Sequence, residues 1–167
     1  AIAVGDTGTC ARLESGALTC WGRLGLPEAL ESRARCGPTP IDGLRSVKQV
    51  VVGSHHGCGL SEDGEVWCWG ANAIGQLGIL REGTTPTGHG GGGHPRVGPT
   101  KVTGLDDVVE LSSFGRAHTC ARRRAGQVFY IRGSDSSRAF DSLLLPGRAD
   151  RVNGLRRGDA GLLLMGC

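Results

Sequence analysis

Cysteine and histidine are the residue types in this chain that could form disulfides, bind metals or transfer protons. The sequence holds seven cysteines and five histidines. Four of the cysteines repeat one arrangement, in which two cysteines flank a polar turn that ends in glycine. The pairs are Cys10 and Cys20 around Gly16, and Cys58 and Cys68 around Gly64. If each segment folds as a β-hairpin, the paired cysteines face each other directly, and opposed Cβ atoms lie close enough for a disulfide. The sequence therefore predicts two disulfides and an oxidising, extracytoplasmic compartment, whether periplasmic, cell-surface or secreted.

Two other interpretations of the cysteines stay open. Each pair could be two buried, reduced thiols that pack well. Zinc is the weaker alternative, because the chain has no C-x2-C spacing and thiols from separate hairpins would have to converge. In the third hairpin the same count places Cys120 opposite Tyr130, so that pair is lost. Cys36, Cys120 and Cys167 have no assignable partner, and because the total is odd, at least one thiol is free or bonded to another chain.

The histidines fall into two groups. Three of them occupy equivalent turns of repeated segments, namely His55, His56 and His118. We expect these three to bond neighbouring backbone between the repeated units rather than to act as metal ligands or bases. His89 and His94 lie in residues 83–98, where glycine, proline and threonine predict a flexible insertion. A metal site is conceivable there, but the segment itself contains no acidic or thiol side chain, so we expect none.

The elements that must position these residues recur along the chain. The apolar run that opens each unit closes on a glycine, at positions 5, 53, 115 and 166, so the spacings are 48, 62 and 51 residues. A period of this size is typical of repeated supersecondary units that bury their apolar faces against one another. We expect a single array over residues 1–167, with units at approximately 1–48, 49–110 and 111–161 and the start of a fourth strand at 162–167.

Each unit is predicted to consist of strands. The opening runs are rich in β-branched residues and bounded by glycine, which indicates strands buried on both faces. A hairpin with a short loop ending in glycine follows. Helical signal is confined to residues 27–33, one or two turns at most.

Composition and charge argue against several classes of function. The net charge is +3 and the basic residues form no dense stripe, so we expect no nucleic-acid partner. No apolar stretch reaches the roughly 18 residues that a direct membrane span needs. The chain lacks G-x-S-x-G, H-E-x-x-H, P-loop and C-x-x-C-H motifs, and we therefore expect no catalytic residues, no metal and no cofactor.

The sharpest motif runs from Cys68 to Gly78 and reads CWGANAIGQLG. Its W-G-x-N-x-x-G-Q-L-G pattern resembles the repeat of the regulator of chromosome condensation (RCC1) family, and residues 50–64 are similar to the family's lead-in to that motif. The Cys-Trp-Gly form at 20–22 and 68–70 is similar to the variant of secreted bacterial members. The first unit shortens the motif, and the third departs from it after residues 118–121. The blade-motif residues are Trp21, Gly22, Trp69, Gly70, Asn72, Gly75, Gln76 and Gly78.

The types of these motif residues predict structural roles. The glycines permit a tight crossing between strands. Trp69 supplies a large body to be buried between units, while Asn72 and Gln76 can satisfy the backbone of the loop. None of these residue types is placed for chemistry.

The resemblance implies an all-β fold of RCC1-type β-propeller blades, with one four-stranded blade per repeat. About three repeats do not close a ring, since closure usually takes roughly four to eight blades. We therefore expect a partial propeller whose end blades contact further blades, from a longer array or from another chain.

The function that follows is a non-catalytic protein-binding or scaffold module of an extracytoplasmic bacterial protein. Its partner would be another protein or further blades, and the variable loops around Cys36 and at 83–98 are the expected contacts. A structural subunit of a larger complex is the first alternative. A regulator similar to a guanine-nucleotide exchange factor and a metal-dependent enzyme are further alternatives.

Overall fold

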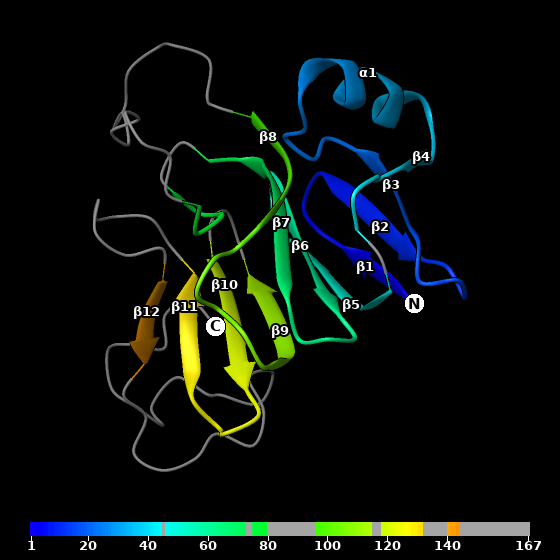
Figure 1. Cartoon of the computed structure of the whole chain (residues 1–167). Coiled ribbons are helices and arrows are strands. Elements are labelled where there is room, and N and C mark those ends of the chain that lie inside the picture. The colour runs from blue at the N-terminus through cyan, green and yellow to red at the C-terminus, as the bar shows by residue number, and fades with distance from the viewer. Residues whose placement is uncertain (45, 73–74, 80–95, 115–117, 132–139, 144–167) are drawn as a thin grey trace.

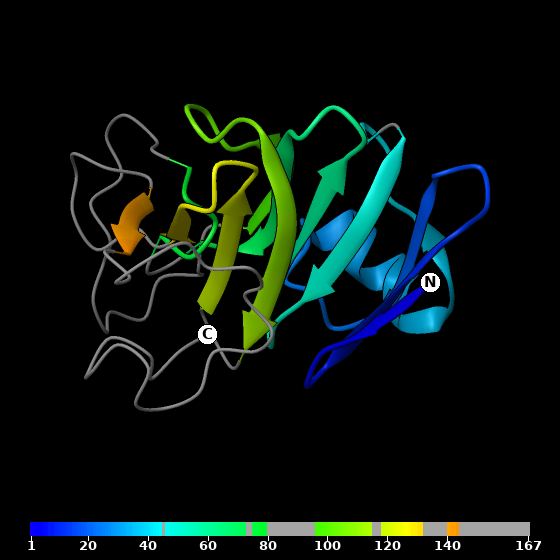
Figure 2. The ribbon, with the colours of Figure 1, turned by 90° about the horizontal axis from the view of Figure 1, so that it is seen from below.

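The computed structural model describes residues 1–44, 46–72, 75–79, 96–114, 118–131 and 140–143, and these form three four-stranded antiparallel sheets. The sheets follow one another along the chain and lie side by side (Figures 1 and 2). Blade 1 consists of β1 (Ile2–Val4), β2 (Gly8–Arg12), β3 (Leu18–Gly22) and β4 (Thr39–Pro40), with helix α1 (Glu28–Cys36) between β3 and β4. Blade 2 consists of β5 (Val47–Val52), β6 (His56–Ser61), β7 (Val66–Ala71) and β8 (Arg96–Lys101). Blade 3 consists of β9 (Val108–Phe114), β10 (His118–Arg123), β11 (Val128–Ile131) and β12 (Phe140–Leu143).

Each sheet is an up-and-down meander in which every strand pairs with the next strand in the chain. The described strands form no closed ring, so the architecture is a partial propeller of three blades. The central hairpins have the register expected from the sequence, because Cys10 opposes Cys20, Cys58 opposes Cys68, and Cys120 opposes Tyr130.

The apolar core is divided between the two blade junctions. Side chains alternate between the two faces of a strand, so each blade offers one row of side chains to each neighbour. The junction of blades 1 and 2 buries a cluster made of Cys10, Leu18, Cys20, Leu24, Leu26, Ala34, Ile41, Leu44, Val47, Val50, Val52 and Trp69. The junction of blades 2 and 3 buries a second cluster that includes Cys58, Leu60, Cys68, Leu77, Leu111, Ala121 and Ile131.

A polar contact also joins the innermost strands of blades 2 and 3. The Gln49 side-chain amide donates to the Leu111 carbonyl at 2.8 Å, and the Leu111 N–H donates to Gln49 Oε1 at 2.8 Å. The amide group thus bonds the neighbouring strand as a backbone peptide would, and it satisfies both polar groups of Leu111 at a partly buried position.

The one helix among the described residues is longer than the sequence predicts. Helical signal was confined to residues 27–33, whereas α1 runs for nine residues from Glu28 to Cys36. Pro27 precedes the helix, where its missing N–H costs nothing, and Arg33 and Arg35 in the last turn favour the negative end of the helix dipole. Ala34 is fully buried where α1 packs against β3 and β4 of blade 1, so tertiary packing supports the extra turn.

The first strand corrects one expectation. The opening apolar runs were predicted to be buried on both faces, but in β1 the side chains of Ile2 and Val4 are 71% and 73% exposed. Only Ala3, which points to the other face, packs against the core. The reason is that blade 1 has a neighbour on one side alone in the described part of the chain.

The unit boundaries and the insertion can be compared with the strands only in part. β5 begins at Val47 and β9 at Val108, whereas the units were expected to begin at 49 and 111. The last three residues of the predicted insertion 83–98 belong to β8, which begins at Arg96. The rest of that insertion, including both of its histidines, and the predicted fourth strand at 162–167 lie outside the described residues.

Candidate functional site

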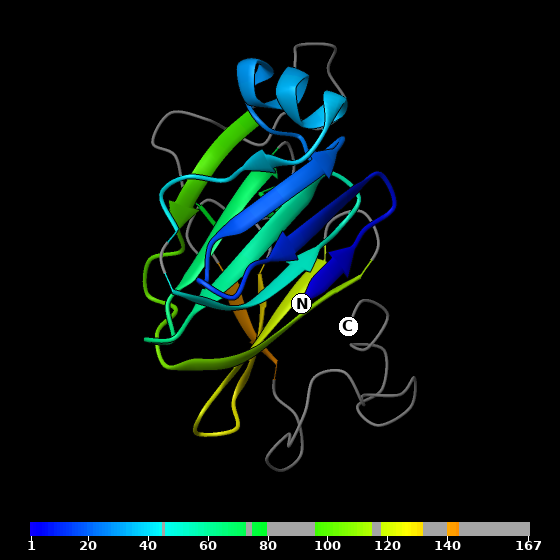
Figure 3. The same ribbon diagram turned by 90° about the vertical axis from the view of Figure 1, so that its right-hand side faces the viewer.

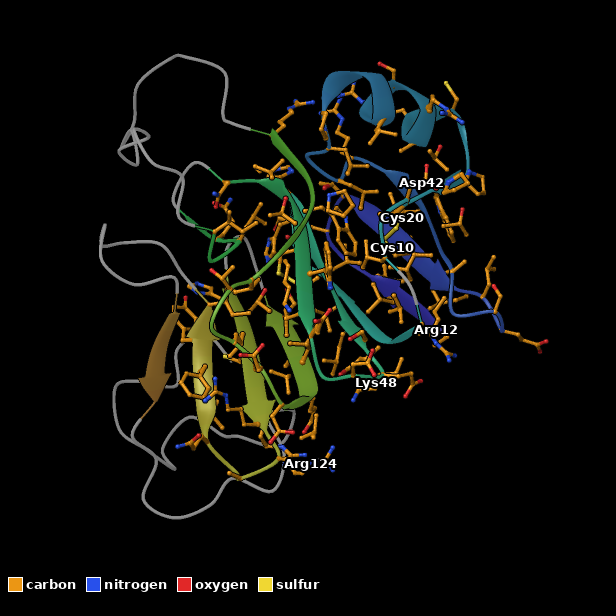
Figure 4. All side chains as sticks on the ribbon, in the orientation of Figure 1. Cys10, Arg12, Cys20, Asp42, Lys48 and Arg124 are labelled. Atoms are coloured by element: carbon orange, nitrogen blue, oxygen red, sulfur yellow. A yellow bond between two sulfur atoms is a disulfide. The ribbon has the colours of Figure 1, made fainter. Side chains whose placement is uncertain are left out.

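The structure brings both cysteine pairs to disulfide distance. The sulfur atoms are 2.13 Å apart in Cys10–Cys20 and in Cys58–Cys68 (the first pair is labelled in Figure 4). All four side chains are 0% exposed, and each pair faces the blade that follows in the chain. Cysteines in such positions hold the central hairpin of a blade closed from within the core and are not available to a substrate or a metal.

The remaining described cysteines lie elsewhere in the fold. Cys36 is a free thiol, exposed at the end of α1. Cys120 is 1% exposed in β10, opposite Tyr130. Cys167 lies outside the described residues.

The two tryptophans of the Cys-Trp-Gly motifs have different environments. Trp69 is 0% exposed in the junction of blades 1 and 2, and its indole lies over Gly57, where an added Cβ would be 2.6 Å from the ring. Trp21 occupies the equivalent place in blade 1 and is only half buried, because its face of the sheet is directed away from blade 2. Gly70 is tightly enclosed, since a Cβ there would lie 2.5 Å from the carbonyl oxygen of His55.

The rest of the motif shapes the loop after β7. The N–H of Leu77 donates to Asn72 Oδ1 at 3.1 Å, and Asn72 Nδ2 donates to the carbonyl of Ile79 at 3.4 Å. Gln76 is buried at 6% exposure. Positive φ values occur at the motif glycines Gly22, Gly70, Gly75 and Gly78. The described part of the motif therefore builds the fold, and it presents no reactive group.

His56 is the most perturbed titratable group. Its ring is fully buried, and Nε2 lies 2.9 Å from Thr119 Oγ1 of blade 3. Burial lowers the pKa of His56 from 6.5 to about 4, with smaller contributions from His118 and His55. The predicted bond between blades exists, but its partner is a hydroxyl group instead of backbone. A neutral imidazole enclosed in this way links two blades and cannot reach a substrate.

The ion pair between Lys101 and Glu65 lies at the surface of blade 2. Lys101 Nζ lies 2.6 Å from Glu65 Oε1, and this hydrogen bond lowers the pKa of Glu65 and raises the pKa of Lys101. Both side chains are 38% exposed, so the pair contributes little to stability. Among the described residues, no three His, Cys, Asp or Glu side chains gather as metal ligands would.

One edge of the structure presents the tips of the three central hairpins. These tips join β2 to β3, β6 to β7 and β10 to β11, and they lie on the side away from α1 (Figure 1). We call this surface the hairpin edge and define it by residues 13–16, 62–64 and 124–126. In each tip the glycine N–H donates to the carbonyl three residues earlier, at 3.0 Å for Gly16, 3.1 Å for Gly64 and 2.9 Å for Gly126.

The hairpin tips are tied to the neighbouring blades. The Gly16 carbonyl accepts a hydrogen bond from the Val47 N–H at 3.2 Å, and the Gly64 carbonyl accepts one from the Val108 N–H at 3.1 Å. The φ angles of Gly16 and Gly64 are +80° and +82°, which residues with a Cβ rarely adopt. A Cβ at Gly64 would also lie 3.2 Å from the Val108 nitrogen. The edge is therefore a continuous surface held by backbone bonds from one blade to the next.

The side chains of the hairpin edge point into solvent. Leu13 is 47% exposed, and Glu14 and Ser15 beside it are also exposed. Glu62 and Asp63 on blade 2 are exposed acids. On blade 3 Arg124 (Figure 4) and Ala125 are exposed, and the ion pair of Arg124 with Asp107 at 3.3 Å is itself open to solvent. The edge thus combines an apolar residue, acids and a base at fixed separations.

Packed four-stranded meanders with equivalent hairpins and equivalent junction residues define a repeat protein of the β-propeller type. Two segments of the chain, residues 47–76 and 63–122, match the family described as the Regulator of chromosome condensation (RCC1) repeat. The chain therefore carries RCC1-like repeats.

Proteins from several organisms are similar in sequence or in structure to this chain. Protein pim1 of Schizosaccharomyces pombe is 37% identical over 86 residues, which are 42% of this chain and 16% of pim1. The X-linked retinitis pigmentosa GTPase regulator homolog of Caenorhabditis elegans is 31% identical over 140 residues, which are 81% of this chain and 9% of that protein. The crystal structure of Prp20p from Saccharomyces cerevisiae superimposes with a TM-score of 0.64 at 21% identity, over 92% of this chain and 39% of Prp20p.

These comparisons agree with the fold, but they limit which properties of the similar proteins can be assigned to this chain. The chain spans a minor part of each of these proteins, between 9% and 39% of their lengths. Helix α1 is too short and too polar to cross a membrane, and the described residues contain no other helix.

Proposed function

We propose that this chain is a non-catalytic protein-binding module and that the hairpin edge is its contact surface. The observation that carries the proposal is the backbone bonding from Gly16 and Gly64 to the next blade, which holds exposed side chains of three blades in one arrangement. Preorganised side chains lose little conformational entropy when a partner binds. Protein interfaces combine an apolar centre with a polar rim. The hairpin edge offers both kinds of side chain, an exposed leucine and charged residues around it.

The solved structures support a binding role. The Prp20p structure was described together with its binding properties to Gsp1p and histones, and a second structure shows yeast RCC1 (Prp20) bound to Kap60. This chain spans 36% to 39% of those chains. We therefore propose for it a protein partner in general, and none of those particular partners.

The proposed setting is extracytoplasmic and bacterial. Two buried cysteine pairs at disulfide distance support an oxidising compartment, because such bonds persist outside the reducing cytosol. The Cys-Trp-Gly form of the motif, present twice, supports the resemblance to secreted bacterial members. A structural subunit of a larger complex is the nearest alternative, and it would be recognised by stable, stoichiometric copurification.

The test is affinity capture with matched variants. The immobilised chain is incubated with an extract of its source organism, and bound proteins are identified by mass spectrometry. Glu62→Arg places a positive charge on the hairpin edge at an exposed side chain and should abolish capture of the partner. Arg33→Glu reverses an exposed charge of α1, a change of equal size and opposite sign, and should leave capture unchanged. Equal capture by both variants would show that the hairpin edge is not the contact surface.

One relative favours a second candidate. The similarity to a GTPase regulator homolog extends over 81% of this chain, so an exchange-factor-like activity is the alternative to simple binding. Release of a fluorescent guanine nucleotide from a panel of small GTPases separates the two. Acceleration by the wild-type chain would support exchange, and an unchanged release rate alongside specific capture would support the binding module.

A further inference from the structure

The central hairpin of blade 3 keeps only one cysteine of the pair that blades 1 and 2 contain. Cys120 stands on β10 in the place that Cys10 and Cys58 have on β2 and β6, and Tyr130 faces it from β11. In blades 1 and 2 the bonded cysteines are ten residues apart, one on each strand of the hairpin. A tyrosine forms no disulfide, so the described hairpin of blade 3 has no such internal bond.

Cys120 lies on the face of blade 3 that is directed away from blade 2. Its neighbour Ala121 belongs to the cluster at the junction of blades 2 and 3, and so does Ile131, the neighbour of Tyr130. Successive side chains of a strand point to opposite faces, so Cys120 and Tyr130 point away from that junction. Figure 3 views the molecule with blade 1 in front, and the face that carries Cys120 is the far side of blade 3.

The sulfur of Cys120 is buried and is not a free thiol. Cys120 and Val128, which lie on the same face, are each 1% exposed, although the described strands form no sheet beyond that face. Cys120 takes part in a disulfide. The other described cysteines are not available to it, because they are the free thiol Cys36 and the bonded pairs Cys10–Cys20 and Cys58–Cys68.

We propose that Cys120 forms a third disulfide with Cys167. The sequence has seven cysteines, and Cys167 is the one that remains after the other six are assigned. Cys167 itself lies outside the described residues. Positions 120 and 167 stand 47 residues apart, so this bond links blade 3 to a later part of the chain, whereas the two other bonds each close a hairpin. The proposal is independent of the hairpin edge.

Formation of this bond oxidises two thiols. The thiols of Cys120 and Cys167 lose two protons and two electrons as the S–S bond forms, and the electrons reduce the disulfide of a thiol–disulfide oxidoreductase to its dithiol. Such oxidants act in the compartments where structural disulfides persist. The loop that this bond closes is longer than the loop in either hairpin, so it restricts the unfolded chain more than each of the other two bonds does.

Peptide mapping without reductant tests the proposal on protein produced in an oxidising compartment. The protein is denatured, its free thiols are blocked with iodoacetamide, and it is digested with trypsin. Trypsin cleaves after lysine and arginine, so each of the three cysteines outside the hairpin pairs lies on its own peptide, namely 36–45, 117–122 and 158–167. We expect 117–122 and 158–167 to be recovered linked and to separate after reduction. Peptide 36–45 should be recovered alkylated, which confirms that the blocking step works.

Two serine variants make the test specific. Cys167→Ser removes the proposed partner, so peptide 117–122 should then be alkylated without reductant. Cys36→Ser is the matched control, because Cys36 is an exposed free thiol, and it should leave the link between 117–122 and 158–167 unchanged. Alkylation of peptide 117–122 in the wild type would overturn the proposal. Its recovery linked to any other cysteine, of the same chain or of a second one, would equally overturn it.

Discussion

Acidification should weaken this fold through His56. The folded state holds the imidazole neutral, since burial lowers its pKa to about 4, whereas the unfolded chain titrates near 6.5. Below pH 6.5 the unfolded state therefore binds a proton at His56, whereas the folded state does not bind one until the pH approaches 4. The contribution of His56 to stability is complete above pH 6.5 and is lost as the pH falls toward 4.

The magnitude follows from the two pKa values. Between pH 7 and pH 5 the difference in proton binding costs about 2 kcal/mol, and at pH 4 the loss approaches about 3 kcal/mol. Domains of this size have total stabilities of roughly 5–15 kcal/mol, so the effect is readily measured. The nearby groups that act on His56 are His118 and His55, and both oppose its protonation. The window from pH 7 to 5 is chosen because most carboxylates stay ionised there.

Urea unfolding at pH 7 and pH 5, followed by tryptophan fluorescence, measures the difference. The wild type should lose about 2 kcal/mol over this interval. His56→Gln keeps a polar group near Thr119 but does not titrate, so it should lose much less, whatever its stability at pH 7. His55→Gln is the control, because His55 is exposed and is the smallest of the three causes that lower the pKa of His56, and it should lose nearly as much as the wild type. A pH-independent wild type, or equal losses in wild type and His56→Gln, would refute the argument.

Three further predictions concern packing, redox state and the insertion. Gly57→Ala places a Cβ 2.6 Å from the Trp69 ring and should cost about 1–3 kcal/mol of unfolding free energy, whereas Gly98→Ala meets no atom within 4 Å and should be nearly neutral by the same urea assay. Non-reducing peptide mapping should recover both cysteine links, and reduction of each should cost about 2–3 kcal/mol; alkylation of all four thiols without reductant would contradict this. Deletion of residues 84–95 should leave the melting temperature nearly unchanged, with or without zinc, and a large drop would show that the insertion has a structural role.

Local rules account for the parts of the fold that the sequence predicts well. The register of the central hairpins follows from counting outward from a turn glycine, because strand pairing about a short turn has little freedom. The same counting opposes Cys120 to Tyr130 in the degenerate third unit. The RCC1-like motif after Trp69 likewise predicts a loop organised by Asn72, since hydrogen bonds over five to seven residues are local.

Other features escaped prediction because they depend on neighbours distant in the sequence. The extra turn of α1 is stabilised by the burial of Ala34 against β3 and β4 of blade 1. The acceptor for His56 is the side chain of Thr119, 63 residues further along the chain. The sequence also did not predict the hairpin edge as a contact surface, because its tips are short polar turns. It indicated the variable loops as the contacts instead. Equivalent hydrogen bonds from Gly16 and Gly64 to the next blade become apparent only in three dimensions.

The sequence by itself determined the repeat, the strand pairing within each blade and the opposition of the cysteines, because these follow from side-chain alternation and turn chemistry over a few residues. Only the tertiary structure decided which face of each strand is covered. Val4 and Val52 are the same residue type at the same place in the repeat, yet one is 73% exposed and the other 7%. The difference is the presence of a neighbouring blade, and burial depends on what packs against a residue as well as on the residue itself.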